Sequence, residues 1–187
     1  MDVKEAIRER RAYRSLKPFK ITKEIVRDMA RSVQLAPSCF NNQPWRMVFV
    51  YGKGPLESMR PALSVGNEWA YAASLIVAVF SKKEDDCIIR DRVYHQFDCG
   101  LGIGFLVLRA TELGLVAHPI AGFSPKKTKE ILHIPEEYDV ITLVIVGKLS
   151  EKLSPVLSEK QISWEKKRPK RIPLDKMAFL NRFGQTK

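Results

Sequence analysis

The chain has 187 residues, a formal net charge of +11 and a hydrophobic content of 45%. This composition is that of a globular protein with a substantial core, and it excludes a mainly disordered or collagen-like chain. The length suits one domain over residues 1–187. The longest apolar runs are far shorter than the roughly 20 residues that a membrane-spanning helix needs, so no transmembrane segment is predicted.

Features of the N-terminus and the cysteines bear on the compartment. The N-terminal residues lack the apolar run of a secretory signal, so a cytoplasmic protein is expected. The cysteines Cys39, Cys87 and Cys99 are odd in number and show no CxxC spacing. Neither a disulfide framework nor a zinc site is therefore predicted.

The positive charge is concentrated near the C-terminus. Residues 148–187 contain 11 basic and 4 acidic residues, which leaves a net charge of +7 in this basic extension. Such a segment is compatible with binding to a polyanion such as nucleic acid. It is equally compatible with a solvated tail that keeps the protein soluble.

The first half of the chain predicts helices and strands in alternation. Asp2 and Glu5 form a helix-start pattern, and Thr22 begins a second helix whose apolar stripe ends at Ala36, because Pro37 follows. The predicted elements that come next are a polar loop over 37–44, a strand over Arg46–Tyr51, a helix from Pro55 and a buried strand over Ser74–Phe80.

A long apolar helix is predicted from about Arg92 to Leu113. Its glycines Gly100, Gly102 and Gly104 should each cost about 1 kcal/mol relative to alanine. Gly100 and Gly104 lie one turn apart on one face, so another element, most simply a second subunit, can approach that face closely. The GxGxG spacing does not match the GxGxxG of a phosphate-binding loop.

The second half of the chain predicts further short elements. They are a strand over Leu115–Ala117, a loop over 118–123, a helix capped by Ser124 before Pro125, a strand over Val140–Val146 and a last short helix over Pro173–Leu180. Because the elements show no strict βαβ rhythm, an α+β or mixed α/β sheet flanked by helices is expected.

Familiar catalytic patterns are not found in the sequence. None of the three histidines has a second ligand at metal spacing, so no metal site is predicted, and there is no GxSxG nucleophile motif. Cys39 could be a thiol nucleophile or a small side chain that lines a pocket. Two basic clusters, around Arg10 and over 167–171, suit anion binding, because arginine pairs well with phosphate, although each alone is typical of a solvated face.

Four segments together resemble the FMN-dependent nitroreductase family. They are Arg10-Arg11-Ala-Tyr-Arg14, Ala36-Pro-Ser-Cys-Phe-Asn-Asn-Gln-Pro-Trp45, the helix from Asp98 to Gly114, and Pro119-Ile-Ala-Gly122-Phe. The resemblance covers nearly the whole chain. It implies an α+β fold with a mixed, mainly antiparallel sheet, an intertwined homodimer with FMN at the interface, and a basic extension that takes part in the dimer and the phosphate site.

The resemblance also implies a set of cofactor-binding residues. Arg10 resembles the arginine that binds the FMN phosphate, and Arg14 the basic residue near flavin N1 and O2, where it would stabilise the reduced flavin. Near the phosphate, the resemblance also matches Arg11 and Ala12, which lie beside Arg10, and Lys170 with Arg171. Near the ring system, it matches Asn67 at the pyrimidine edge, and Pro119, Ala121 and Gly122 close to N5 and O4. The residues that would reach FMN from the other subunit are Pro37, Ser38, Cys39 and Asn41. Ala12 departs from the serine of many relatives.

The activity expected from this resemblance is an FMN-dependent oxidoreductase. NADH or NADPH would deliver hydride to flavin N5, and a nitroaromatic, quinone or similar acceptor would then take it in a ping-pong reaction. Because the flavin carries the chemistry, no catalytic side chain is expected. Two alternatives remain, a flavin-binding redox sensor or carrier and a module that binds nucleic acid or an acidic partner. The second loses support because the resemblance gives the arginine clusters another use.

Overall fold

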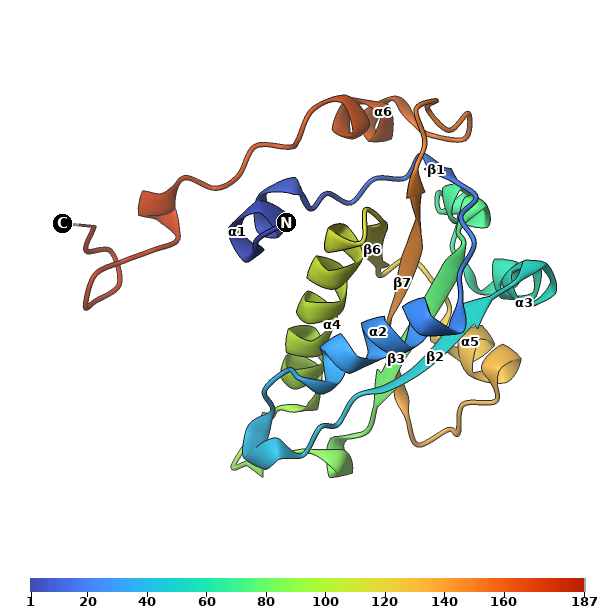
Figure 1. Cartoon of the computed structure of the whole chain (residues 1–187). Helices are drawn as coiled ribbons and strands as arrows, with labels where there is room; N and C mark the ends of the chain where they lie inside the picture. The colour runs from blue at the N-terminus through green and yellow to red at the C-terminus, as the bar shows by residue number, and fades with distance from the viewer. Residues whose placement is uncertain (187) are drawn as a thin grey trace.

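A computed structural model describes residues 1–186 as helices packed on both faces of a central sheet (Figure 1). Its antiparallel strands have the order β1-β7-β3-β2, and β6 pairs with β7 on the side opposite β3. These strands are β1 (Leu16–Lys17), β2 (Arg46–Tyr51), β3 (Leu75–Ser81), β6 (Val116–Ile120) and β7 (Asp139–Leu149). The expected α+β fold with a mainly antiparallel sheet is therefore confirmed.

The helices begin largely where the sequence predicts. They are α1 (Val3–Glu9), α2 (Lys23–Gln34), α3 (Lys53–Met59), α4 (His95–Glu112), α5 (Pro125–Leu132) and α6 (Glu159–Lys166). Asp2 accepts the Glu5 N–H at 2.7 Å, and Thr22 and Ser124 cap α2 and α5 in the same way. Side-chain oxygens at these positions satisfy N–H groups that the first helical turn leaves unpaired.

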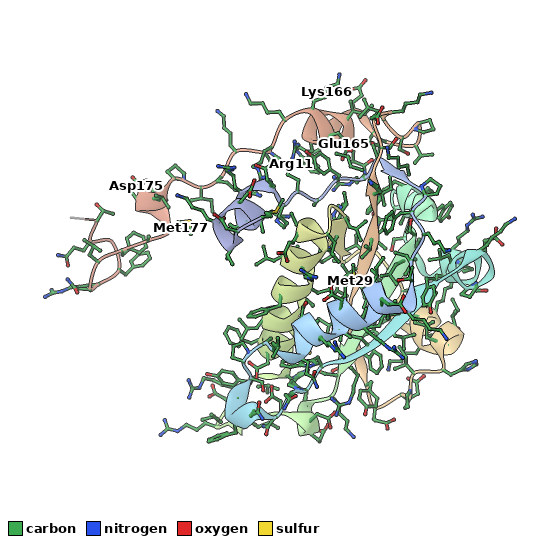
Figure 2. All side chains as sticks on the ribbon, in the orientation of Figure 1. Arg11, Met29, Glu165, Lys166, Asp175 and Met177 are labelled. Carbon is green, nitrogen blue, oxygen red and sulfur yellow. A yellow bond between two sulfur atoms is a disulfide. The ribbon has the colours of Figure 1, made fainter. Side chains whose placement is uncertain are left out.

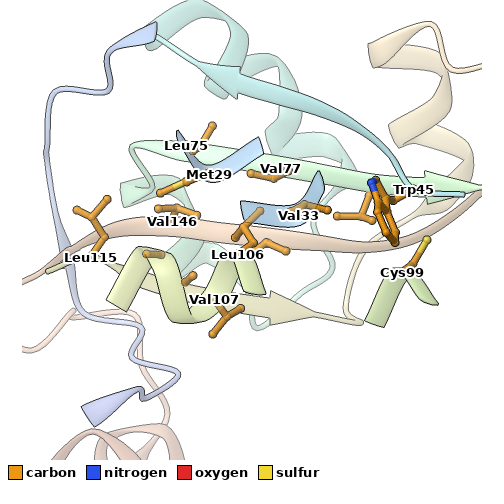
Figure 3. Close-up of a cluster of buried hydrophobic side chains, with 14 of the residues drawn as sticks. Met29, Val33, Trp45, Leu75, Val77, Cys99, Leu106, Val107, Leu115 and Val146 are labelled. Atoms are coloured by element: carbon orange, nitrogen blue, oxygen red, sulfur yellow. The ribbon is translucent and has the colours of Figure 1, made fainter. Parts of the chain in front are cut away.

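Strand β3 is buried along its whole length, so both of its faces are covered and the core has two layers. Alternate side chains of a strand point to opposite faces of the sheet. Leu75 and Val77 pack with Met29 and Leu106 beneath α2 and α4, as Figure 3 shows. On the other face, the neighbouring side chains of β3 join a second cluster that contains Trp69 and Met59. The sheet therefore separates two apolar layers and fixes the positions of the helices on each.

The glycines of α4 have two different environments. A Cβ at Gly102 would lie 2.8 Å from Cγ1 of Val33, so this glycine permits the close packing of α4 on α2. Gly100 and Gly104 are exposed, and a Cβ at either would meet no atom of the described chain within 4 Å. The exposed ring of Phe105 lies beside Gly104. This face of α4 is open to a second molecule.

Some predicted element boundaries are wrong. The hairpin of β4 (Ile88–Ile89) and β5 (Arg92–Val93) occupies the expected start of the long helix. Strand β6 continues into the expected loop, where Pro119 is tolerated because β6 lies at an edge of the sheet. The last helix is only a short 3-10 turn over Leu174–Lys176, and α6 was not predicted.

The expectation that no disulfide forms is also wrong. Cys39 and Cys87 are disulfide-bonded, with their Cα atoms 6.1 Å apart, and Cys99 is a buried free thiol. The two bonded cysteines are separated by 48 residues, so only the fold brings them together. Within residues 1–186, none of the helices has both the length and the apolar character needed to cross a membrane.

The segment over 167–186, which we call the C-terminal arm, leaves the body of the molecule and extends past α1 (Figure 1). It carries large apolar side chains that are more than half exposed, namely Ile172, Leu174, Met177, Leu180 and Phe183. Figure 2 shows Met177 on this arm, well away from the core methionine Met29. Such an apolar arm lacks a covering surface in the single chain.

Candidate functional site

A hollow of about 180 Å³, which we call the arginine hollow, lies between the segment after α1 and the segment after α6. It is lined by Arg10, Arg11, Ala12, Arg14, Trp164, Arg168, Pro169 and Arg171. Five of the sequence-predicted cofactor residues therefore come together from the two ends of the chain. Lys170 is exposed and does not belong to this lining.

Glu165 fixes the segment that carries the N-terminal arginines. Its side chain is buried, and its two carboxylate oxygens accept the backbone N–H groups of Arg14 at 2.8 Å and Ser15 at 3.1 Å. The Oγ of Ser15 in turn accepts the backbone N–H of Ser154. These bonds hold two distant parts of the chain against each other at one wall of the hollow.

Arg11 is an anchor within the chain. Its guanidinium donates hydrogen bonds to the carbonyl oxygens of Trp164 and Glu165, at 2.6 and 3.0 Å, and to the hydroxyl of Tyr13 at 2.9 Å. Figure 2 shows Arg11 beneath Glu165 and α6. Because three of its N–H donors already have partners in the chain, Arg11 is less available than Arg10 as a ligand of a cofactor.

Arg10 and Arg171 differ from Arg11 because neither guanidinium donates a hydrogen bond to any residue that the structure describes. The pKa of Arg10 is lowered, first by burial and then by the positive charges of Arg168 and Arg171. Among residues 1–186, no carboxylate lines the hollow to balance these charges. An anion with several oxygens, such as a phosphate, would relieve the repulsion and supply acceptors.

Arg14 connects the arginine hollow to an aromatic group. Its guanidinium carbon lies 5.4 Å from the ring centroid of Trp164 and 5.8 Å from that of Trp69. Burial lowers the pKa of Arg14, and the nearby charge of Glu165 opposes this shift. Arg14 therefore presents a half-buried positive charge between two large rings.

His118 packs against Trp69, one of the two rings beside Arg14. Its ring stacks on Trp69, with the ring centroids 4.8 Å apart, and its Nδ1 lies 3.2 Å from the carbonyl oxygen of Tyr13. Burial, and then the charge of Arg14, lower the pKa of His118 to about 4. The imidazole is thus neutral near pH 7, and an Nδ1–H group can donate to Tyr13.

Asn67 and Gly122, which the sequence places far apart, are neighbours. The Asn67 amide donates to the carbonyl oxygen of Gly122 at 2.8 Å, and its own oxygen accepts the indole N–H of Trp69 at 3.0 Å. A Cβ at Gly122 would meet the Asn67 amide nitrogen, so glycine is required for this close approach. Pro119 and Ala121 are exposed beside it. Trp69 contacts both Asn67 and Arg14, and so it connects this pair to the arginine hollow.

The loop over 37–44 lies at the other end of α4. The backbone N–H of Cys39 donates to Asp98 at 2.6 Å near the start of α4, whereas the end of α4 lies against the N-terminal residues Met1 and Val3. An 18-residue helix is about 27 Å long, so the loop and the arginine hollow of one chain are far apart. The predicted residues in this separate group are Pro37, Ser38, Cys39 and Asn41.

The backbone of this loop is unusual. Phe40, Asn41 and Gln43 all have positive φ angles, between 47° and 60°, and the ring of Phe40 is 86% exposed. The Gln43 N–H donates to the Ser38 hydroxyl. Such conformations cost energy for residues other than glycine, so the surrounding contacts must hold the loop in place.

Sequence reasoning missed Trp69, Trp164, His118 and Glu165. Ser158 and Gln161 form a capping box at the start of α6, and this pattern could have predicted the helix that carries two of them. No local pattern marks Glu165, because its partners Arg14 and Ser15 lie about 150 residues away in the chain.

Known proteins resemble this chain along most of its length. The nitroreductase family model matches residues 7–64 and 62–148. A relative from Thermus thermophilus named NADH dehydrogenase is 24% identical over 186 residues, which cover 83% of this chain and 90% of the relative.

Solved structures show the same fold. A crystal structure described as an oxidoreductase containing FMN is 28% identical, covers 99% of this chain and 93% of its own, and has a TM-score of 0.85. A complex with FMN from Exiguobacterium sibiricum 255-15 is 20% identical, covers 97% and 98% of the two chains, and has a TM-score of 0.79. The fold and the family match both agree with the resemblance seen in the sequence segments. The chain therefore belongs to the nitroreductase family.

Proposed function

We propose that this chain is an FMN-dependent oxidoreductase that uses NADH or NADPH and reduces a nitroaromatic, quinone or similar small acceptor in a ping-pong reaction. When bound, FMN supplies the two-electron chemistry that links the nicotinamide to the acceptor. The observation that carries the proposal is the arginine hollow, which both Arg10 and Arg171 line and to which the described residues contribute no carboxylate. Its size and charge fit the phosphate of a mononucleotide.

The remaining residues are arranged to bind the other parts of such a cofactor. Arg10 and Arg171 would hold the phosphate, and Arg14 would place its positive charge where negative charge develops on the reduced ring system. The bonds that join Asn67 to Gly122 and to Trp69 hold the loop around Gly122 beside the aromatic stack. His118 is neutral and bonded to Tyr13, so its role is to support Trp69 and not to transfer protons.

A homodimer completes this site. Two features support it, namely the apolar C-terminal arm and the open face of α4 at Gly100 and Gly104. Removing apolar surface of this kind from water is favourable by about 25 cal/mol per Å², which opposes the entropic cost of association. The distance between the loop over 37–44 and the arginine hollow means that the loop would serve the site of the second subunit. The cytoplasmic location stays a prediction.

The activity can be tested with purified protein loaded with FMN. Under anaerobic conditions, the yellow absorbance should bleach on addition of NADH or NADPH and return on addition of a quinone. A chain that binds FMN tightly but does not bleach with either nicotinamide would support the alternative, a flavin-binding sensor or carrier. A chain that cannot be reconstituted with FMN would refute both.

The phosphate assignment can be tested separately. Arg10→Ala and Arg171→Ala should each raise the Kd for FMN about 10- to 150-fold, because each removes a charged hydrogen bond worth roughly 1.5–3 kcal/mol. Exposed Lys152 offers a matched control, since Lys152→Ala removes one positive charge outside the hollow. If both arginine variants keep the FMN affinity of the control, the assignment is wrong.

The dimer can be tested by sedimentation of the full chain. The double variant Leu174→Asp with Phe183→Asp places charges on the apolar arm and should give a monomer with weakened FMN binding. Replacing the exposed arm residue Arg182 with alanine should leave the dimer intact. A wild-type chain that remains monomeric at micromolar concentration would contradict the proposed assembly.

A further inference from the structure

A cluster of metal-binding groups lies beside the loop over 37–44, outside the arginine hollow. Cys39, Asp86 and Cys87 each offer one ligand atom, and these three atoms lie within 4.8 Å of one another. Cys39 belongs to the loop, whereas Asp86 and Cys87 lie just before β4. The two sulfur atoms are joined as a disulfide in the structure. We call this group the Cys-Asp cluster.

One oxygen of Asp86 has no partner although it is buried. Asp86 is 8% exposed, and its Oδ1 accepts the backbone N–H of Cys87 at 2.7 Å and the side-chain amide of Asn42 at 3.3 Å. Its Oδ2 is buried with no hydrogen-bond partner within residues 1–186. Buried polar atoms almost always have a partner, so this oxygen points to a ligand that binds there.

A second carboxyl group adds negative charge to the same place. Asp98 is 2% exposed and accepts the Cys39 N–H. Asp98 and Asp86 therefore both lie beside Cys39, Asp98 through this hydrogen bond and Asp86 as a member of the three-residue cluster. The nearby cation Arg46 pairs with Asp85, at 3.5 Å. Two buried carboxyl groups beside the same cysteine are costly unless a positive charge lies between or beside them.

We infer that the reduced Cys39 and Cys87, together with Asp86, bind a zinc ion. Two thiolates and a carboxylate are typical zinc ligands, and a water molecule would complete the tetrahedron. The carboxyl group of Asp98 orients the loop end of the site through the Cys39 N–H, and the positive ion offsets the charge of both carboxylates. Zinc binding itself needs neither FMN nor a nicotinamide, although Cys39 belongs to the loop that would serve the cofactor site of the second subunit.

The disulfide and the metal are alternative states of the same two sulfur atoms. A dithiol reductant breaks the bond between Cys39 and Cys87 by supplying two electrons and two protons, and its own thiols become a disulfide. Zinc then binds the two sulfurs, and each thiol releases one proton to water. In both states the loop is tied to the segment before β4, which would hold Phe40 and its positive-φ neighbours in place. Only the reduced, metal-free form has no link through these two sulfur atoms, and the loop is then held by weaker contacts such as the hydrogen bonds to Asp98 and Asp86.

Metal binding to the full-length, FMN-loaded protein tests this inference. The protein is reduced with dithiothreitol, desalted without oxygen, mixed with zinc chloride and passed through a gel-filtration column before elemental analysis. We expect one zinc per chain after reduction and none in the oxidised protein. Cobalt should give an absorption band from thiolate-to-metal charge transfer in the reduced protein. If the reduced protein retains no more zinc than the oxidised protein, the inference is refuted.

Three variants define the ligands. Cys87→Ser should lose zinc binding, and Asp86→Asn, which keeps both thiols and the shape of the side chain, should weaken it at least 10-fold. Cys99→Ser is the matched control, because Cys99 is a buried thiol outside the three-ligand group and its replacement should leave zinc binding unchanged. Equal zinc affinity in Asp86→Asn and the wild type would refute the three-ligand site even if Cys87→Ser failed to fold.

Discussion

Replacing Glu165 with glutamine tests whether the arginine hollow is preorganised by the end of α6. The carboxylate of Glu165 accepts two backbone N–H groups, from Arg14 and Ser15. A glutamine can accept with one oxygen only, and its NH₂ group would face the other N–H donor. The variant therefore loses one charged hydrogen bond and leaves a buried donor unpaired, which costs about 1.5–3 kcal/mol.

This loss should be visible in FMN affinity. If the segment around Arg14 must be ordered again when the cofactor binds, the Kd for FMN rises about 10- to 150-fold. Glu159→Gln is the matched control, because Glu159 lies on the same helix and is exposed. Titration of apoprotein with FMN, followed by flavin fluorescence, measures both variants. Equal Kd values for the two would refute the view that Glu165 organises the hollow.

Three other changes have defined outcomes. Between pH 6.5 and about 4 the unfolded state binds a proton that buried His118 does not, so the free energy of unfolding should fall by about 3 kcal/mol as the pH drops through this range. In urea unfolding, His118→Phe should reduce this pH dependence, whereas exposed His133→Asn should not. Gly102→Ala should lower the free energy of unfolding by about 1–3 kcal/mol, because the new Cβ would press on Val33. Gly104→Ala should leave the fold intact and weaken dimerisation, as sedimentation would show, and an unchanged dimer would contradict the proposed use of that face.

The sequence predicted the local features of the fold well. Helix α2 begins after Thr22 and strand β2 covers Arg46–Tyr51 as expected, because capping groups and short runs of apolar residues act over a few positions. The strand β6 was predicted too short, since Pro119 was taken as a loop signal. Its place at the sheet edge, where an N–H group is not needed, depends on tertiary structure and leaves no local signal.

The candidate site was only partly predictable. The resemblance implied cofactor roles for Arg10, Asn67 and Gly122; in the structure Arg10 lines the arginine hollow and Asn67 bonds to Gly122, and the cofactor roles stay predictions. Long-range partners were not accessible from the sequence. Glu165 acts across about 150 residues, and Cys39 meets Cys87 only because the loop before β2 folds toward the segment before β4. Odd cysteine number and missing CxxC spacing therefore led to the wrong expectation about the disulfide.

The separation of the loop and the arginine hollow along α4 has a genetic consequence. In the proposed dimer, each active site combines the hollow of one chain with the loop of the other. At limiting FMN, a homodimer with Arg10→Ala in both chains and a homodimer with a disrupted loop in both chains would each have two impaired sites. Mixed dimers of the two would contain one site with both defects and one site with none. Coexpression of two defective alleles should therefore restore activity, up to half of the wild-type value per mixed dimer.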